Sequence, residues 1–408
     1  MLIYPADVVM MLQEASKVGV SADVKSVDFE GIMGRMRSFV MHDSQRQAFA
    51  VETTPNLRWY KDKGEFISDY TMKIGNDTVE ADRIFIASGA RPGIPKIKGI
   101  ESVRYLTSDT VLELKKQPES MIIIGGGYIA TEYGHFFSAI GTRVTIVQRS
   151  PRLLPDEEPE ISELLKEDME KRIRTITNHE AVEVKENKDA KTVIARNRET
   201  GEMLELSAEA LLIAAGRVPN SDLLKPEKTG VKLDNRGYVI VNEYLETEKK
   251  NIWAFGDAIG KEMFKHVANY EAEIAWHNSI HEHKVKMDYP AAPHAVFTHP
   301  QIASVGLKEA EAKQKGHKIL VGKAYYKDTA LGAAMGEPEG FVKVIVERQT
   351  GKILGAHIIG PSAATLIQEI IDVMVTGEKT FLPIFRAMHI HPAMPEVVQK
   401  AFGSLREA

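Results

Sequence analysis

Six consecutive residues in the middle of the chain have the types and spacing of a phosphate-binding turn: Gly125, Gly126, Gly127, Tyr128, Ile129 and Ala130. In the pattern G-x-G-x-x-G/A, the first glycine permits a tight turn and the second lets a pyrophosphate approach the backbone. The small third residue lets a helix pack on a strand. The helix that opens at the turn offers free N–H groups and the positive end of its dipole to phosphates.

The elements around this turn are those that such a site needs. The apolar run MIII precedes the turn, a helical stretch follows it, and VTIV returns as a second strand. Residues Met121–Gln148 are therefore predicted to form a strand–turn–helix–strand unit that binds a nicotinamide dinucleotide.

The residue that ends the second strand indicates which dinucleotide this is. An acidic side chain there would bond the ribose 2′-hydroxyl of NAD. The chain has Gln148 instead, followed by Arg149 and Arg152. This favours NADP, whose 2′-phosphate the arginines would meet, over NAD. The alternative is that both arginines are solvated surface charges.

Composition narrows the class of protein. The chain has 408 residues, 52 basic and 57 acidic, with a net charge of −5. This balance argues against nucleic acid as a main partner. No run approaches the roughly 18 apolar residues of a membrane span, and the N-terminus lacks the basic region of a signal peptide. We therefore expect a cytoplasmic protein.

Cysteine is absent from the chain. Structural disulfides, thiolate metal sites and thiol nucleophiles are therefore excluded within these residues, and no metal site is predicted.

The chain repeats one pattern, a strand followed by Gly, Arg and Pro, at residues 84–92 and 211–219. Two related nucleotide-binding domains would explain the repeat. Helical spacing is found at residues 5–16 and 160–175, strands are predicted at 66–74 and 80–87, and residues 181–213 are rich in β patterns. Ser108-Asp109 has the types of a helix cap. Past about residue 290, strands alternate with amphipathic helices and no further nucleotide turn occurs.

Several motifs together resemble the FAD-dependent pyridine nucleotide–disulfide oxidoreductases, such as dihydrolipoamide dehydrogenase, mercuric reductase and mycothione reductase. The motifs are IASGARPGIP, IIIGGGYIATE, LLIAAGRVPN, NIWAFGD, VFTHPQIASVGL, GKILGAHIIG and HIHPAMPE, and they cover essentially the whole chain. The run KHVANYEA looks most like the mycothione reductase branch.

The resemblance implies an α/β fold with two Rossmann-like domains, for FAD and NAD(P), and a C-terminal α+β dimerisation domain. The expected boundaries are 1–117 for the remainder of an N-terminally truncated FAD domain, 118–236 for the NAD(P) domain, 237–288 for the return of the FAD domain, and 289–408 for dimerisation.

The resemblance also assigns cofactor contacts. Residues that match flavin-side positions of the family are Gly64, Ser88, Gly89, Asp257, Met263, Phe264, Lys265 and His266. Tyr128 matches a tyrosine that covers the flavin in some members, and Glu132 matches a glutamate that pairs with a lysine. Gly216 and Ala181 match contacts to the nicotinamide nucleotide.

The end of the chain matches the acid–base pair of the family, His391 with Glu396. A histidine titrates near neutral pH, and a carboxylate fixes its tautomer and raises its basicity. In the family this histidine acts at the other subunit, which implies a homodimer that acts on a small disulfide or dithiol. His389 is interpreted as a neighbour of the catalyst.

Two parts of the family pattern are missing: the first G-x-G-x-x-G for FAD, and a C-x-x-x-x-C pair of redox cysteines. We interpret Met1 as an internal methionine of a longer disulfide reductase, so the chain alone is expected to bind FAD weakly, to dissolve poorly and to be impaired as an enzyme. One alternative is a cysteine-free, non-catalytic NAD(P)-binding dimer. Another is a dihydrolipoamide dehydrogenase that runs toward NADH.

Overall fold

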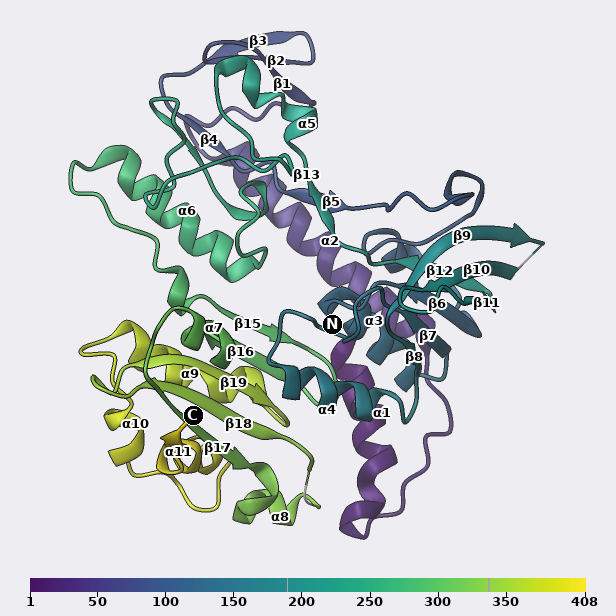
Figure 1. Cartoon of the computed structure of the whole chain (residues 1–408). Helices are drawn as coiled ribbons and strands as arrows, with labels where there is room; N and C mark the ends of the chain where they lie inside the picture. The colour runs from purple at the N-terminus through teal and green to yellow at the C-terminus, as the bar shows by residue number, and fades with distance from the viewer. Residues whose placement is uncertain (189, 337) are drawn as a thin grey trace. The chain divides into compact units, whose positions relative to one another are not determined.

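The computed structural model describes residues 1–188, 190–336 and 338–408, and its elements group into two units (Figure 1). Unit 1 contains residues 1–37, 94–215 and 293–408, whereas unit 2 contains residues 38–93 and 216–292.

A parallel sheet in unit 1 carries the predicted nucleotide turn. Its strands are β12 (Ala210–Ile213), β6 (Ser120–Ile124), β7 (Arg143–Val147) and β8 (Arg174–Ile176), in that order. The side chains of β6 alternate between two apolar cores, as the two-residue period of a strand requires. Met121 and Ile123 pack with the helical side, and Ile122 and Ile124 pack with the opposite side. Burial on both faces explains the uninterrupted apolar run MIII.

Helices cover one face of this sheet and a second sheet covers the other. The helices are α3 (Tyr128–Ala139) and α4 (Pro159–Met169). The second sheet is antiparallel, with the order β11 (Met203–Ala208), β10 (Ala190–Asn197), β9 (His179–Asn187). Its Val184 and Val193 lie in the same core as Ile122.

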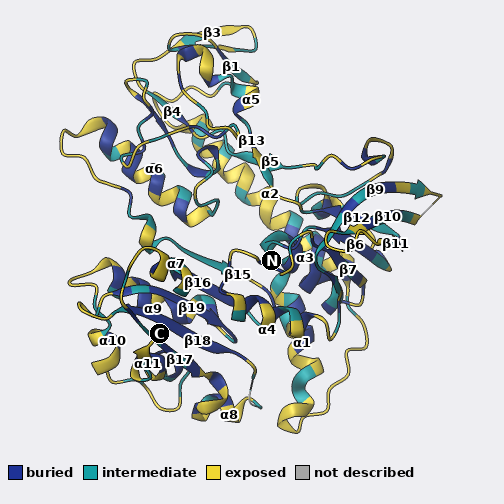
Figure 2. Cartoon of the chain, in the orientation of Figure 1, coloured by how far each residue is buried: buried dark blue, intermediate teal, exposed yellow. Residues whose placement is uncertain are grey.

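The C-terminal part of unit 1 is built on an antiparallel sheet. Its order is β15 (Pro293–Val296), β16 (Ile302–Gly306), β19 (Ile353–Ile359), β18 (Phe341–Glu347), β17 (Ile319–Tyr325), β20 (Arg406–Glu407). The helices of this part are α7 (Glu309–Gln314), α8 (Ala330–Ala334), α9 (Ala363–Val375), α10 (Leu382–Arg386) and α11 (Glu396–Gly403). The apolar faces of α9 and α11 pack on this sheet, whose central strands are buried (Figure 2).

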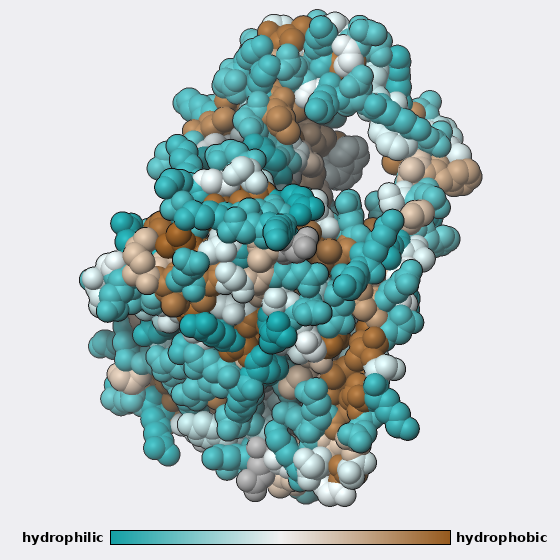
Figure 3. Space-filling view, turned by 90° about the vertical axis from the view of Figure 1, so that its right-hand side faces the viewer, coloured by the Kyte–Doolittle hydropathy of each residue, from teal (hydrophilic) through white to brown (hydrophobic). Residues whose placement is uncertain are grey.

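Two helices form the start of the chain. Helix α1 (Ile3–Glu14) packs against α3. Helix α2 (Phe29–Thr53) begins in unit 1 and ends in unit 2, and its buried residues Phe29, Met33 and Met36 all lie in its first turns. Later apolar residues of α2, such as Phe39 and Phe49, are exposed. Apolar groups also lie among polar ones on the side of the chain drawn in Figure 3.

Unit 2 contains short strands around one apolar core that includes Phe66 and Trp253. Its antiparallel sheet has the order β1 (Gly64–Ser68), β2 (Thr71–Ile74), β3 (Asp77–Glu80). Strand β4 (Ile84–Ile86) pairs in parallel with β14 (Ile252–Ala254), and β5 (Ala90–Pro92) pairs antiparallel with β13 (Arg217–Pro219). Besides the second half of α2, the helices are α5 (Ser221–Leu224) and α6 (Lys265–Ile280).

The predicted fold class is confirmed, and some predicted elements change. The strand expected at 66–74 is the β1–β2 hairpin, and the strand expected at 80–87 is reduced to β4. The prediction that a helix follows Ser108-Asp109 is wrong. The chain forms a single 3₁₀ turn at Thr110–Glu113, and Asp109 makes no cap bond. The hydroxyl of Thr107 accepts the amides of Asp109 and Thr110 at 3.3 Å instead.

Among the described residues, no helix is both long and apolar enough to cross a bilayer.

Candidate functional site

The glycine turn joins β6 to α3, and the fold itself requires its first two glycines. Gly125 has φ 126°, and a Cβ there would lie 2.1 Å from the carbonyl oxygen of Ala214. A Cβ on Gly126 would lie 2.7 Å from side-chain atoms of Gln148. Side chains at either position would force the turn apart.

Gly127 is different, because neither conformation nor packing requires a glycine there. Its φ of −82° suits any residue, and a Cβ would meet no protein atom within 4 Å. Gly127 is the N-cap of α3, and no side chain caps the helix. The first amides of an α-helix have no partner within the helix, and the space beside Gly127 is open, so the turn fits the pyrophosphate of a dinucleotide.

Helix α3 lies close to the sheet through small residues. Ala130, the third small residue of the motif, is fully buried. A Cβ on Gly134, one turn later, would lie 3.0 Å from Ile146 on β7. The G-x-G-x-x-G/A pattern includes Ala130 but does not extend to Gly134.

The end of β7 places the residues predicted to select the nucleotide. Gln148 is buried, and its Nε2 donates to the carbonyl oxygen of Arg152 at 3.3 Å. Arg149 and Arg152 are exposed, and Arg152 forms an ion pair with Glu163 at 3.6 Å. A third arginine, Arg198 after β10, donates from Nη1 to the carbonyl oxygen of Arg149 at 3.2 Å. No motif marks Arg198, and only the folded hairpin brings it to this place.

Other predicted nucleotide-side residues lie on α3 and β9. Tyr128 and Ile129 form the first turn of α3 and are partly buried. Glu132 accepts the backbone amide of Phe297 at 2.9 Å, and burial raises the pKa of its carboxyl group. Ala181 is buried among the apolar residues that cover the parallel sheet.

His391 and Glu396 lie together, at the start of α11. The Nδ1 of His391 lies 2.8 Å from Oε1 of Glu396, and Oε2 accepts the amide of Ala393 at 3.1 Å. The hydrogen bond from His391, followed by that from Ala393, lowers the pKa of Glu396. The His391 side chain is 69% exposed. The ring is thus oriented by a carboxylate while its Nε2 side remains accessible.

His389 occupies a different environment from His391. Its Nε2 lies 3.4 Å from Oε2 of Glu369, and its side chain is only 6% exposed. Burial raises the pKa of Glu369.

The predicted flavin-side residues lie in unit 2. Ser88 and Gly89 follow β4, and Ser88 Oγ is buried without a hydrogen-bond partner. Asp257 lies after β14 and forms an ion pair with Arg217 at 3.3 Å. An orphaned hydroxyl and a carboxylate, each past the carboxyl end of one of two paired parallel strands, fit part of an FAD site. In the described residues the parallel sheet here pairs only β4 with β14.

The remaining flavin-side residues are spread along unit 2. Gly64 opens β1. Gly216, which was expected to contact the nicotinamide nucleotide, also lies in unit 2; it precedes β13, and its carbonyl oxygen accepts the amide of Gly93 at 2.8 Å. Met263 accepts the hydroxyl of Tyr238 at 3.8 Å. The Phe264 and His266 rings stack at 5.8 Å around Lys265, the first residue of α6.

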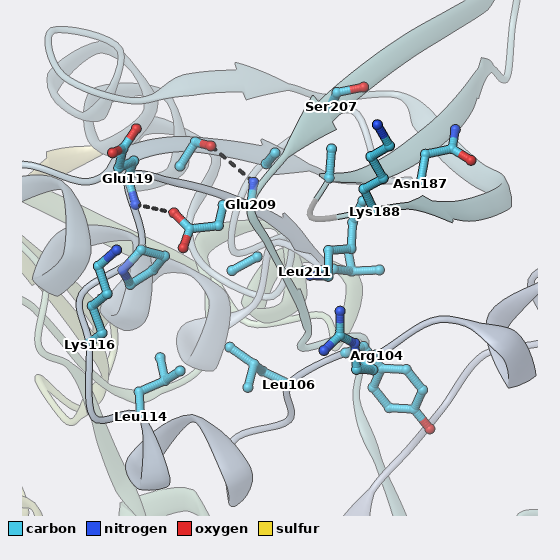
Figure 4. Close-up of a pocket in the computed structure, with 17 residues that line it drawn as sticks. Arg104, Leu106, Leu114, Lys116, Glu119, Asn187, Lys188, Ser207, Glu209 and Leu211 are labelled. Atoms are coloured by element: carbon cyan, nitrogen blue, oxygen red, sulfur yellow. Dashed lines mark hydrogen bonds between the residues drawn. The ribbon is translucent and has the colours of Figure 1, made fainter.

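A cavity of about 930 Å³ lies elsewhere in unit 1, at the amino ends of β6 and β12 (Figure 4). Its lining includes the apolar Leu106 and Leu211 and the basic Lys116 and Lys188. Dinucleotides bind at the carboxyl ends of parallel strands. This cavity is therefore at the wrong edge of the sheet to be the nucleotide site. The described residues contain no cluster of metal-ligating side chains.

Comparison with known proteins shows which family this chain belongs to. Residues 13–272 match the model for pyridine nucleotide-disulphide oxidoreductases, and residues 292–402 match the model for the dimerisation domain of that family.

Individual relatives agree. A mycothione reductase of Mycobacterium tuberculosis is 36% identical over 418 residues, covering 100% of this chain and 90% of the relative. A dihydrolipoyl dehydrogenase of Synechocystis is 34% identical over 359 residues, covering 84% of this chain and 74% of the relative. The structure of the HOCl-induced flavoprotein disulfide reductase RclA of Escherichia coli superposes with a TM-score of 0.83. Its sequence is 26% identical, and the match covers 97% of this chain and 89% of that one.

The match of both family models, and of relatives along the whole chain, does not favour a separate class of non-catalytic binding protein. This chain belongs to the pyridine nucleotide-disulphide oxidoreductases, the flavoprotein disulfide reductases that bind FAD and NAD(P)H.

Proposed function

We propose that this chain binds NADPH in preference to NADH at the Gly125–Gly127 turn and provides His391 and Glu396 as the acid–base pair of a reductase of small disulfides, as in mycothione reductase. The observation that carries the proposal is Gly127, a glycine with an ordinary φ and with open space where its side chain would be. Close approach of a phosphate to the backbone accounts for a glycine there, whereas the fold does not.

Three arginines support the preference for NADPH. Arg149 and Arg152 are exposed where β7 ends, and Arg198 donates to the carbonyl oxygen of Arg149. Guanidinium groups bind phosphate with charge-assisted hydrogen bonds. The position of a ribose-binding acid is taken by Gln148, whose side chain is buried.

The His391–Glu396 pair supports the proton chemistry. Overall, one NADPH and one proton reduce a disulfide to two thiols. FAD, when bound, relays the electrons in this family. His391, held at Nδ1 by Glu396, would exchange protons with the thiols through Nε2. The 408 residues contain no cysteine, so the exchanging thiols are not among them.

Nucleotide binding is tested by the substitution Gly127→Ala. We expect the 408-residue chain to bind NADPH in isothermal titration calorimetry, and the variant to lose about tenfold or more in affinity because its methyl group takes the place of the pyrophosphate. Its melting temperature should stay close to that of the wild type, because a Cβ at this position meets no protein atom.

The control is Gly34→Ala on α2, where a Cβ also meets no atom within 4 Å. This variant should bind NADPH like the wild type. Unchanged binding by Gly127→Ala would remove the basis of the proposal. A wild-type preference for NADH would favour a dihydrolipoyl dehydrogenase type of enzyme instead.

A further inference from the structure

A buried lysine in the C-terminal sheet connects that sheet to the nucleotide-binding part of unit 1. The Lys343 side chain on β18 is 4% exposed, and its Nζ lies 2.7 Å from Glu309, 2.9 Å from Glu160 and 3.3 Å from Glu158. Burial lowers the pKa of Lys343, but hydrogen bonds to Glu309 and Glu160 and the charge of Glu158 outweigh it and raise the pKa. A charge this deeply buried is kept only with such partners.

The segment that ends in Glu158 is fastened to the C-terminal part of unit 1 at three consecutive residues. The carbonyl oxygen of Asp156 accepts Lys308 Nζ at 3.0 Å. Glu157 bonds to Nε2 of His294 at 2.5 Å and accepts the hydroxyl of Ser304 at 2.6 Å. Glu158 accepts the amide of Glu309 at 2.6 Å and pairs with Lys343. All three residues lie between β7 and α4.

The other end of the same segment is fastened to the glycine turn. The amide of Leu154 donates to the carbonyl oxygen of Gly126 at 2.7 Å. Leu154 is buried and has φ 44°, in the left-handed region that costs energy for a residue with a side chain. The segment is therefore held in an unfavourable backbone conformation by contacts at both ends.

The arginines proposed to read the 2′-phosphate lie just before the Leu154 attachment in the chain. Arg152 lies two residues before Leu154, and its carbonyl oxygen accepts Gln148 Nε2. Arg149 immediately follows Gln148. A shift of residues 156–158 would thus be transmitted through Leu154 to the hydrogen bond at Gly126 and to Arg152, and through the Gln148–Arg152 hydrogen bond to Arg149.

We propose that Lys343, through Glu158, is a positioning residue that sets the preference for NADPH over NADH. It is a lysine of the C-terminal domain that touches no nucleotide. This inference rests on the proposed binding of NADPH at the glycine turn. A purely structural ion pair would contribute to stability alone, whereas a positioning residue also controls the ratio of the two affinities.

The test uses Lys343→Met, which removes the charge at similar length, and Glu158→Gln, which keeps an acceptor for the amide of Glu309 while removing the ion pair. The dissociation constants of NADPH and NADH are measured by calorimetry, together with the melting temperature. Glu158→Gln keeps the test decisive if Lys343→Met does not fold. The matched control is Lys323→Met, because Lys323 pairs with Glu160 and not with Glu158.

We expect both variants to weaken NADPH binding by about tenfold and NADH binding much less, the scale of one lost charge-assisted hydrogen bond, and the control to change neither. A lower melting temperature with an unchanged ratio of affinities, or an equal loss for both nucleotides, would overturn this inference and leave the proposed function unaffected. A wild-type chain that does not prefer NADPH would overturn the proposed function, and this inference with it.

Discussion

The chemistry of His391 depends on which ring nitrogen carries the proton. The lowered pKa of Glu396 keeps its carboxylate ionised at neutral pH, and an ionised carboxylate only accepts hydrogen bonds. The 2.8 Å contact therefore places the proton of a neutral His391 on Nδ1 and leaves Nε2 as the basic nitrogen.

We predict that ¹⁵N NMR of histidine-labelled protein shows neutral His391 as the Nδ1–H tautomer. Glu396→Gln should shift the population toward Nε2–H, because an amide can donate as well as accept and no longer enforces one tautomer. Glu369→Gln is the control, because it changes the partner of His389 and not that of His391. An Nε2–H tautomer in the wild type would contradict the role assigned to Glu396.

Residues that act through local geometry could be predicted from the sequence, and residues that act through distant contacts could not. The glycine turn and the His391–Glu396 contact each involve neighbours within a few positions. The spacing of the turn indicated the first, and the resemblance of the chain's end to the family indicated the second. Arg198 reaches Arg149 across 49 positions. No pattern in either segment reveals that contact, which exists only because the β9–β11 sheet folds over the parallel sheet.

Among the elements, α1 could be predicted from a local pattern of apolar residues, whereas α2 could not. Apolar residues with helical spacing predicted a helix at 5–16, and α1 is found at Ile3–Glu14. Helix α2 was not predicted, because only its first turns are buried and the rest shows no apolar stripe. At residues 110–113 the expected cap residues were present, but Asp109 makes no cap bond, the hydroxyl of Thr107 accepts the amides of Asp109 and Thr110, and the chain forms only one 3₁₀ turn.

The end of α1 is attached to the C-terminal part of unit 1 by an acid-sensitive contact. Glu14 Oε2 lies 3.3 Å from Nε2 of His299, and Glu14 Oε1 accepts Lys17 Nζ at 2.8 Å. The hydrogen bond from His299 lowers the pKa of Glu14 from 4.5 to about 2, against the opposing effect of burial.

Since the folded pKa lies below the unfolded one, this contact stabilises the fold fully above pH 4.5 and loses its effect as the pH falls toward 2. The Glu14 side chain is 33% exposed, so solvent screening reduces the contribution to about 1 kcal/mol. We expect Glu14→Gln to lower the free energy of unfolding in urea by about that amount at pH 6, and the difference to shrink by pH 3.

Glu30→Gln, at an exposed glutamate of α2, is the control for the loss of one acidic charge. A difference between Glu14→Gln and wild type that stays constant from pH 6 to pH 3 would show that the carboxylate of Glu14 is not the source of the stability.

At the scale of the whole molecule, the C-terminal part of unit 1 presents apolar side chains beside the proposed acid–base pair. Met388 is 101% exposed and Ile390 is 78% exposed, and both lie just before His391. Large apolar residues this exposed next to a functional group are typical of a surface that a partner covers. Because residues 292–402 match a dimerisation domain, we propose that this partner is a second copy of the chain.

We therefore expect light scattering after gel filtration to give twice the 45.4 kDa mass of one chain. Met388→Asp with Ile390→Asp should shift the protein toward the monomer, because two buried carboxylates at an interface cost several kcal/mol when unpaired. NADPH binding should persist, since the glycine turn lies in residues 125–127, outside the dimerisation match.

The control Met203→Asp, at a methionine of β11 that is 59% exposed, should leave the mass unchanged. A monomeric wild type would contradict the homodimer, and a double variant that stays dimeric would place the interface away from the acid–base pair.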